Sequence, residues 1–292
     1  MRKVTIAAVQ MGCEKDVNSN IKKAAEYVKE AACGKFRADI ILLPELFERQ
    51  YFCQERMYEY YSYAKPVMEN DAVLYFLKLT EKLKVTVPVS FYEKEGNVMY
   101  NSAAVIDSGR LLGVYRKTHI PDDHFYQEKF YFTPGNTGFK VWDTKSCRLG
   151  VGICWDQWFP ETARCLALNG AEILMYPTAI GSEPILAADS SMHWRRTMQG
   201  HAAANLMPVA AANRIGIEKV FPCEGNANQS SELTFYGSSF ITDNTGEIAA
   251  SASRDKEEII KAEFDFDALV KDRLSWGLFR DRRPEMYHDI TV

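Results

Sequence analysis

Hydrophobic residues follow two patterns along the chain, short unbroken apolar runs and longer stretches in which apolar positions recur every three or four residues. The unbroken runs predict buried strands at 4–9, 38–44, 149–153, 173–176 and 208–213. The periodic stretches predict helices over about 18–33, 71–84, 160–169 and 187–205. We expect Asn18 or Asn20 to cap the first helix. Strands that alternate with helices in this way favour neighbouring strands covered by a helix.

In two other parts of the chain, strands follow one another through short turns. They are predicted at 85–92, 98–106 and 111–115, and again as a hairpin over 237–252 with a further strand at 258–264. A short helix over 266–274 and an irregular tail over 275–292 follow. Because both patterns occur, we predict an α/β fold in one domain over 1–292, with two stacked sheets covered outside by helices.

Two stretches lack clear periodicity and are predicted to be loops. The first, 216–236, is polar and rich in Gly and Asn, and the second, 122–138, is long and rich in aromatic residues. Long ordered loops in compact domains are often functional. Glu128 lies among the aromatic residues of the second loop, where it is either a surface acid or a buried partner for a nearby cation.

The amino-acid composition argues against some classes of function but does not identify one. The chain has 292 residues, 47% hydrophobic and 25% charged, with a net charge of -4, which is typical of a globular protein. This balance does not favour nucleic-acid binding, and no apolar run is long enough to predict a membrane span. The N-terminus enters a strand pattern directly and does not read as a signal peptide. The seven cysteines show neither paired nor metal-ligand spacing, so we expect a reducing, cytoplasmic location and no metal site.

Three chemically active residues lie at the carboxyl ends of predicted strands, namely Glu45, Lys117 and Cys154. Open α/β sheets place their reactive groups at such strand ends. Each residue alone has an ordinary structural explanation, as a solvated loop acid, an edge lysine or an inert buried thiol. Their repeated position suggests that the three side chains meet at one site.

The residues around these positions resemble a known family. The blocks are Leu-Pro-Glu45-Leu-Phe, Tyr-Arg-Lys117-Thr-His and Gly-Ile-Cys154-Trp-Asp, in this order. Together they are similar to the carbon–nitrogen hydrolases of the nitrilase superfamily, over nearly the whole chain. The resemblance implies an α-β-β-α sandwich and a Glu45–Lys117–Cys154 catalytic triad. It also implies homodimers built through a helical face, often assembled further, and we expect the tail 275–292 to take part in these contacts.

The chemistry of amide hydrolysis fits these residue types. Cys154 is expected to be the nucleophile, with Glu45 transferring its proton to the leaving nitrogen and then activating water. Lys117 and the backbone N–H of Trp155 are expected to stabilise the oxyanion, and Glu128 to hold Lys117 in place. This scheme requires neither a metal nor an organic cofactor.

The stretches 119–135, 179–184 and 198–205 resemble the branch of the family that cleaves a carbamoyl group from an amine. Relatives that act on carbamoyl amino acids carry an arginine pair soon after the nucleophile, whereas Cys154 is followed by Trp-Asp-Gln-Trp158. We therefore expect a small cationic ureido substrate. Its ammonium is assigned to Glu183, and its methylene chain to a slot between Tyr51 and Trp158.

Other functions are compatible with the same residues. Within enzymes, the alternative is an amidase or nitrilase for another small linear substrate. From other classes, the chain could be a non-catalytic binding member of the family, or a thiol redox sensor. The intact triad positions argue against the former, and the lack of an obvious resolving cysteine argues against the latter.

Overall fold

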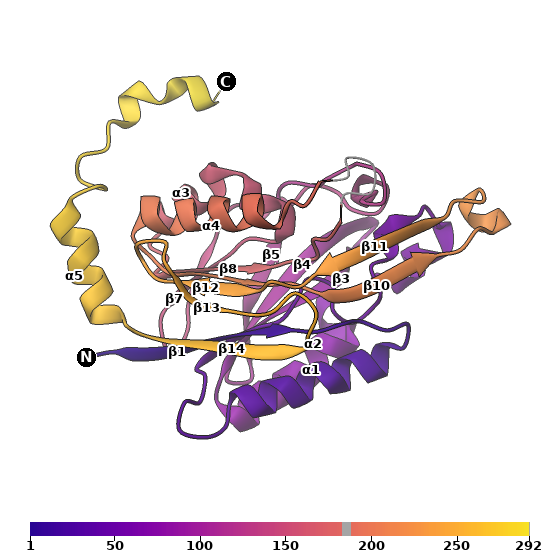
Figure 1. The fold of residues 1–292 in the computed structure, drawn as a ribbon, viewed down its shortest axis with the longest axis horizontal. Coiled ribbons are helices and arrows are strands. Elements are labelled where there is room, and N and C mark those ends of the chain that lie inside the picture. Colours follow the sequence, from indigo (N-terminus) through magenta and orange to yellow (C-terminus); the bar gives the residue numbers. More distant parts are fainter. Residues whose placement is uncertain (183–187, 292) are drawn as a thin grey trace.

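The computed structural model describes residues 1–182 and 188–291. Two six-stranded mixed sheets lie face to face, with helices on both outer faces (Figure 1). The fold is therefore the α-β-β-α sandwich that the sequence predicts. No helix in these described ranges is both long and apolar enough to cross a membrane.

The first sheet has the strand order β14-β1-β2-β3-β4-β5. Its strands are β1 (Lys3–Gln10), β2 (Ile40–Leu42), β3 (Thr86–Glu95), β4 (Val98–Asp107), β5 (Arg110–Arg116) and β14 (Glu258–Asp265). The helices α1 (Val17–Ala31) and α2 (Asp71–Leu83) cover its outer face. β1 and β2 are parallel neighbours, with Ile6 opposite Ile40, which confirms the predicted β-α-β start.

The second sheet has the order β13-β12-β9-β8-β7-β6. Its strands are β6 (Val141–Asp143), β7 (Arg148–Val151), β8 (Ile173–Pro177), β9 (Val209–Ala212), β12 (Phe240–Thr242) and β13 (Ile248–Ser251). The helices α3 (Pro160–Leu168) and α4 (Ser191–Asn205) cover its outer face. β7, β8 and β9 are parallel, so the carboxyl end of β7 opens at the same edge as that of β8.

Apolar residues fill three layers, one between the sheets and one beneath each helical face. β1 contributes to two of them, because Val4, Ile6 and Ala8 face the other sheet while Ala7 and Val9 face the helices. Burial on both faces explains why this strand is apolar at every position from 4 to 9 except Thr5, which is also buried. Packing against the other sheet and against the helices thus fixes where the strands end, and the candidate site lies at these strand ends.

The predicted loop over 216–236 is wrong, because this stretch contains an antiparallel hairpin. β10 (Ile215–Val220) pairs with β11 (Ser231–Tyr236), and the hairpin extends beyond the two sheets (Figure 1). Buried Leu233 and Phe235 alternate with exposed Glu232 and Thr234, a strand pattern that the polar turn residues obscured. The short edge strand β6 was also not predicted.

Two helix starts differ from prediction. Asp16 caps α1 by accepting from the backbone N of Ser19 at 2.7 Å. Asn20 is instead buried inside the helix, where its side chain accepts from the backbone N of Glu14 and donates to the backbone O of Glu48. The helix expected from residue 187, which lies outside the described ranges, begins at Ser191.

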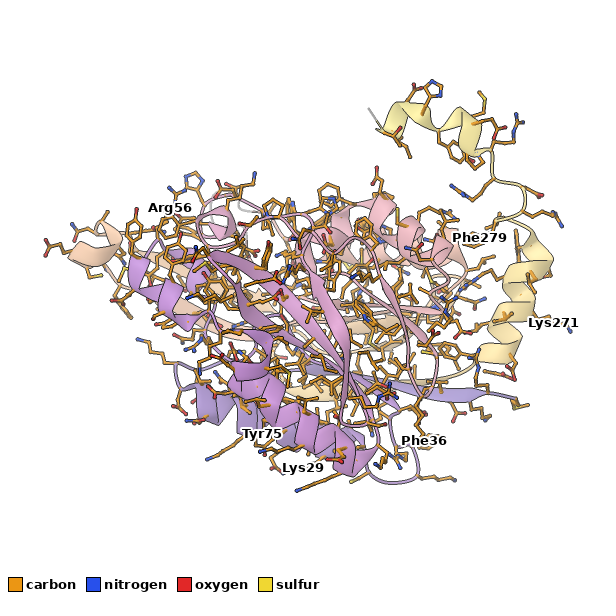
Figure 2. The ribbon with its side chains drawn as sticks, turned by 180° about the vertical axis from the view of Figure 1, so that it is seen from behind. Lys29, Phe36, Arg56, Tyr75, Lys271 and Phe279 are labelled. Carbon is orange, nitrogen blue, oxygen red and sulfur yellow. The ribbon has the colours of Figure 1, made fainter. Side chains whose placement is uncertain are left out.

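The C-terminal segment leaves the body of the sandwich. After α5 (Phe266–Trp276), the chain runs outward and turns back above α3 (Figure 1). Phe279 remains close to the body (Figure 2), with the guanidinium of Arg164 5.1 Å from its ring centroid. Beyond it, Met286 and Ile290 are exposed apolar side chains.

Candidate active site

Cys154 sits at a sharp turn between β7 and the 3₁₀ helix η5 (Cys154–Trp158). Its φ of +40° is in the left-handed region, which a cysteine adopts only when its surroundings enforce it. The Sγ atom lies 3.8 Å from the backbone O of Ala179, and the residue is 6% exposed. Asn213 fixes the neighbouring backbone, since its side chain bonds both the N (3.0 Å) and the O (2.9 Å) of Ile180.

Asp156 holds this turn in place. Its Oδ2 accepts from the backbone N of Ile153 at 2.9 Å and from the hydroxyl of Tyr115 at 2.7 Å. Its Oδ1 accepts from the backbone N of His119 at 2.9 Å and contacts Nδ1 of the same residue at 2.7 Å. His119 lies two residues after Lys117, so one buried carboxylate ties the nucleophile's turn to the segment that carries the lysine.

Glu45 follows β2 and is fully buried. Its Oε1 accepts from Nδ2 of Asn101 at 2.7 Å and from Nζ of Lys117 at 2.8 Å. Its Oε2 has no hydrogen-bond partner among the described residues. One oxygen is therefore anchored by two donors while the other keeps its lone pairs available for a proton.

Lys117 follows β5 and is also fully buried. Besides Glu45, its Nζ contacts Oε2 of Glu128 at 2.6 Å. The other oxygen of Glu128 accepts from the hydroxyl of Tyr51 at 2.6 Å. Because the lysine lies between two carboxylates, its ammonium is fixed within the site.

Burial and charge together set the protonation of these groups. Burial alone lowers the pKa of Lys117, but the carboxylates of Glu128 and Glu45 more than offset this effect and raise it well above the usual value, so the lysine is charged. Burial, followed by the negative charge of Glu45, raises the pKa of the Cys154 thiol well above its usual value. Cys154 is therefore a protonated thiol at rest, and such a thiol needs a base in order to act as a nucleophile.

The structure thus brings together four of the predicted residues, Glu45, Lys117, Glu128 and Cys154, with Tyr51 beside them. Tyr51 is 1% exposed and its hydroxyl bonds Glu128. Glu183 lies outside the described residues.

The two tryptophans after Cys154 lie beside each other, with ring centroids 6.2 Å apart. The side chain of Trp155 is 39% exposed, while its backbone N–H belongs to the first turn of η5, where helical N–H groups lack partners within the helix. Trp158 packs toward the layer beneath α3 and α4, with its ring centroid 4.7 Å from that of His193.

Sequence reasoning missed two residues of the site. Asn101 lies within β4 and donates to Glu45, and an asparagine in the middle of a strand gives no local signal of this role. Asp156 received no role in the sequence analysis, but donors from two segments surround its carboxylate. Its position two residues after the nucleophile was the available signal.

A thiol, a carboxylate with a free oxygen and a fixed ammonium form a set suited to acyl transfer. The thiol can attack a carbonyl, the carboxylate can move the proton and the ammonium can stabilise the oxyanion.

Comparison with known proteins agrees with this chemistry. The family model described as carbon-nitrogen hydrolase matches residues 5–273, and the chain belongs to this family. The chain is 51% identical over 288 residues to a protein of Solanum tuberosum named N-carbamoylputrescine amidase, covering 98% of this chain and 94% of the relative. It is also 51% identical over 293 residues to a protein of Francisella tularensis subsp. tularensis named citrullinase, covering 100% and 99%. A solved carbon-nitrogen hydrolase from Helicobacter pylori superimposes with a TM-score of 0.90 at 36% identity, covering 99% of both chains.

The electrostatics of Glu128 generate a prediction for stability. Burial is the main cause that raises the pKa of this carboxyl from 4.5 to about 7. A raised folded-state pKa means that stability is fully present below the ordinary value and declines as pH rises through about 7. We expect Glu128→Gln, which stays neutral, to show a smaller fall in Tm than the natural protein between about pH 5 and about pH 7.

The matched control is Glu59→Gln, which alters an exposed glutamate in the 3₁₀ helix Tyr58–Tyr63 and should keep the natural pH dependence. Thermal unfolding followed by circular dichroism measures the difference. An unchanged slope in Glu128→Gln would show that Glu128 does not titrate in this range.

Proposed function

We propose that this chain hydrolyses N-carbamoylputrescine to putrescine, carbon dioxide and ammonia, through a carbamoylated Cys154. The observation that carries the proposal is the buried Glu45–Lys117–Cys154 cluster in a chain about half identical, over nearly all of its length, to proteins named for this activity. The product amine connects the reaction to polyamine synthesis. The seven free cysteines support a cytoplasmic setting.

In the first half of the reaction, the Cys154 thiol loses its proton to Oε2 of Glu45 as the sulfur attacks the ureido carbon. The carbonyl oxygen becomes an oxyanion, which the ammonium of Lys117 and the backbone N–H of Trp155 stabilise. Losing one such donor costs about 10²–10³-fold in rate. Glu45 then gives the proton to the amine nitrogen, the C–N bond breaks and putrescine leaves.

In the second half, the thioester carbon of the carbamoyl group remains on sulfur. Glu45 removes a proton from water, whose oxygen attacks this carbon, and the C–S bond breaks. The sulfur takes back the proton from Glu45, which restores the thiol, and the carbamate product decomposes to carbon dioxide and ammonia. General acid–base assistance of this kind contributes about 10²–10⁴-fold. Besides the chain and its substrate, the steps need only this water molecule.

Citrulline is the second candidate, because the relative named citrullinase is as similar to this chain as the N-carbamoylputrescine amidases are. Both molecules present a ureido group on a short methylene chain, but citrulline adds a carboxylate at the far end. The segment after Cys154 offers Asp156 and no cation in the described helix η5. Within η5, therefore, no side chain could form an ion pair with a carboxylate, which favours the substrate that lacks one.

A substrate panel tests the proposal. We expect ammonia release to be fastest with N-carbamoylputrescine and slower with citrulline, N-carbamoyl amino acids, aliphatic amides and nitriles. Cys154→Ser is the control and should fold normally with nearly no turnover, because a serine hydroxyl is a weak nucleophile without an adapted base. Higher kcat/KM for citrulline would transfer the assignment to that substrate. No turnover of any compound would favour a binding function.

Recognition of the substrate ammonium is assigned to Glu183. The chain just before it is close to the site, since the backbone N of Gly181 donates to the hydroxyl of Tyr126, whose ring lies 5.7 Å from that of Tyr51. A hydrogen bond to a charged group contributes about 1.5–3 kcal/mol. Tyr51 remains a proposed wall of the slot for the methylene chain, whereas the ring of Trp158 packs beside His193 beneath α3 and α4, which does not support its assignment to the slot.

We expect Glu183→Gln to lower kcat/KM for N-carbamoylputrescine by about 10- to 150-fold. An uncharged N-alkylurea of the same length serves as the comparison, because it lacks the ammonium and should lose little. Equal losses for both compounds would mean that Glu183 acts on structure or catalysis and that the ammonium binds elsewhere.

We also propose that two copies of the chain associate through the α3–α4 face. A cavity of about 840 Å³ lies between these helices and the tail, lined by both apolar and arginine side chains. Buried His201 and Asn205 line it, and each has a side-chain atom without a partner in the described structure. An exposed apolar tail beside such a cavity is typical of a surface that a partner covers.

Removing residues 277–292 tests this assembly. We expect light scattering to give a smaller particle for the truncated chain than for the full chain, since Met286 and Ile290 are lost from the contact. Lys271→Glu is the control, because this side chain points away from the body on α5 (Figure 2) and should leave the mass unchanged. A full chain that is already monomeric would contradict the proposal.

A further inference from the structure

Arg214 is a buried cation outside the group formed by Glu45, Lys117, Glu128 and Cys154, and all three of its guanidinium nitrogens donate hydrogen bonds. It lies between β9 and β10 and is fully buried. Its Nε and Nη2 donate to the backbone O of Glu45 at 3.1 and 2.9 Å, and Nη2 also reaches the backbone O of Leu46. Its Nη1 donates to the backbone O of Arg49 at 2.8 Å. One guanidinium thus binds three carbonyls of the segment that begins at the proposed base.

The other end of this segment is held by the same ion pair. Glu218 contacts Nη1 of Arg214 through Oε1 at 3.1 Å and accepts from the backbone N of Tyr51 through Oε2 at 2.5 Å. The guanidinium carbon lies 5.9 Å from the ring centroid of Tyr51 and 5.8 Å from that of Phe235. Segment 45–51 is therefore fixed at Glu45, where it supplies the base, and at Tyr51, which bonds Glu128.

The conformation of the segment explains why it needs such a partner. Leu46 has a φ of +47°, so the chain leaves β2 through a left-handed residue and its carbonyls turn out of the sheet. Buried carbonyls need donors, and the planar fork of an arginine can serve several at once, which a lysine ammonium cannot do with the same geometry. A buried ion pair does not by itself stabilise a fold. We therefore interpret the pair of Arg214 and Glu218 by what it orients, which is segment 45–51.

We propose that Arg214, held by Glu218, is a positioning residue that fixes the carboxylate of Glu45 and, through Tyr51, that of Glu128. The proposal rests on the proposed function only in taking Glu45 as the base. The guanidinium contacts no reacting atom; it sets where the base lies relative to the Cys154 thiol.

The first test is Arg214→Lys, which keeps the charge but loses the fork. We expect kcat to fall by about 10- to 100-fold with KM nearly unchanged, because small displacements of a catalytic group have effects of this size. Arg273→Lys is the matched control. Arg273 also bridges two backbone carbonyls, those of Leu206 (3.3 Å) and Ala171 (3.0 Å), but far along the chain from segment 45–51. It should keep the natural kcat.

The second test separates positioning from general support of the fold and needs no substrate. The rate of Cys154 alkylation by iodoacetamide is measured by peptide mass in four proteins: natural, Arg214→Lys, Glu45→Gln and the double variant. If Arg214 acts through Glu45, Arg214→Lys slows alkylation in the natural background and has no further effect in the Glu45→Gln background. An equal slowing in both backgrounds, or none in either, would overturn the proposal.

Because alkylation does not depend on which substrate is hydrolysed, a failed substrate panel would leave this test standing. If Arg214→Lys does not fold, as judged by circular dichroism, Glu218→Gln takes its place. That variant keeps the guanidinium and its carbonyl bonds but weakens the support shared by Arg214 and Tyr51. We expect Glu218→Gln to lower kcat by less than the fall of about 10- to 100-fold expected for Arg214→Lys, and to slow alkylation only when Glu45 is present. If Glu218→Gln changes neither kcat nor alkylation, the proposal is wrong.

Discussion

The ammonium of Lys117, enclosed between the carboxylates of Glu45 and Glu128, is the interaction on which the site depends. All three side chains are almost completely removed from water. A lone buried charge of either sign would be strongly unfavourable, whereas the group of three is tolerable because each charge has a partner at 2.6 to 2.8 Å. The same arrangement makes the ammonium a fixed source of positive potential that needs no rearrangement when an oxyanion forms.

The sandwich is what allows this arrangement to exist. Glu45 and Lys117 extend from strands of the first sheet, and Cys154 from a strand of the second. The apolar layer between the sheets therefore sets the position of Glu45 relative to Cys154. Hydrogen bonds also connect the two sheets. Asp156 accepts from the backbone N of Ile153, which follows a strand of the second sheet, and from that of His119, which follows a strand of the first. The distances between Glu45, Lys117 and Cys154 therefore depend on how the two sheets pack together and not on the conformation of a single loop.

The sandwich and the positions of three site residues could be predicted from the sequence, because both depend on patterns within short stretches of the chain. Unbroken apolar runs located the strands, and the residues just after them located Glu45, Lys117 and Cys154. The β10–β11 hairpin escaped because its exposed face is polar and it lies beyond the sheets, so its alternation resembled a loop. Asn101 and Arg214 escaped for another reason, since their partners are about 56 and 169 positions away and no local pattern encodes such contacts.

The sharp turn at Cys154 and the burial of its thiol have a consequence for oxidation. Peroxides react with thiolates, and a thiol that stays protonated in a nearly closed site is a poor target for them. Cys33 and Cys223, both exposed, meet an oxidant in solution first. The sulfur of Cys154 thus stays a protonated thiol until an electrophile enters the site and the neighbouring carboxylate of Glu45 takes the proton.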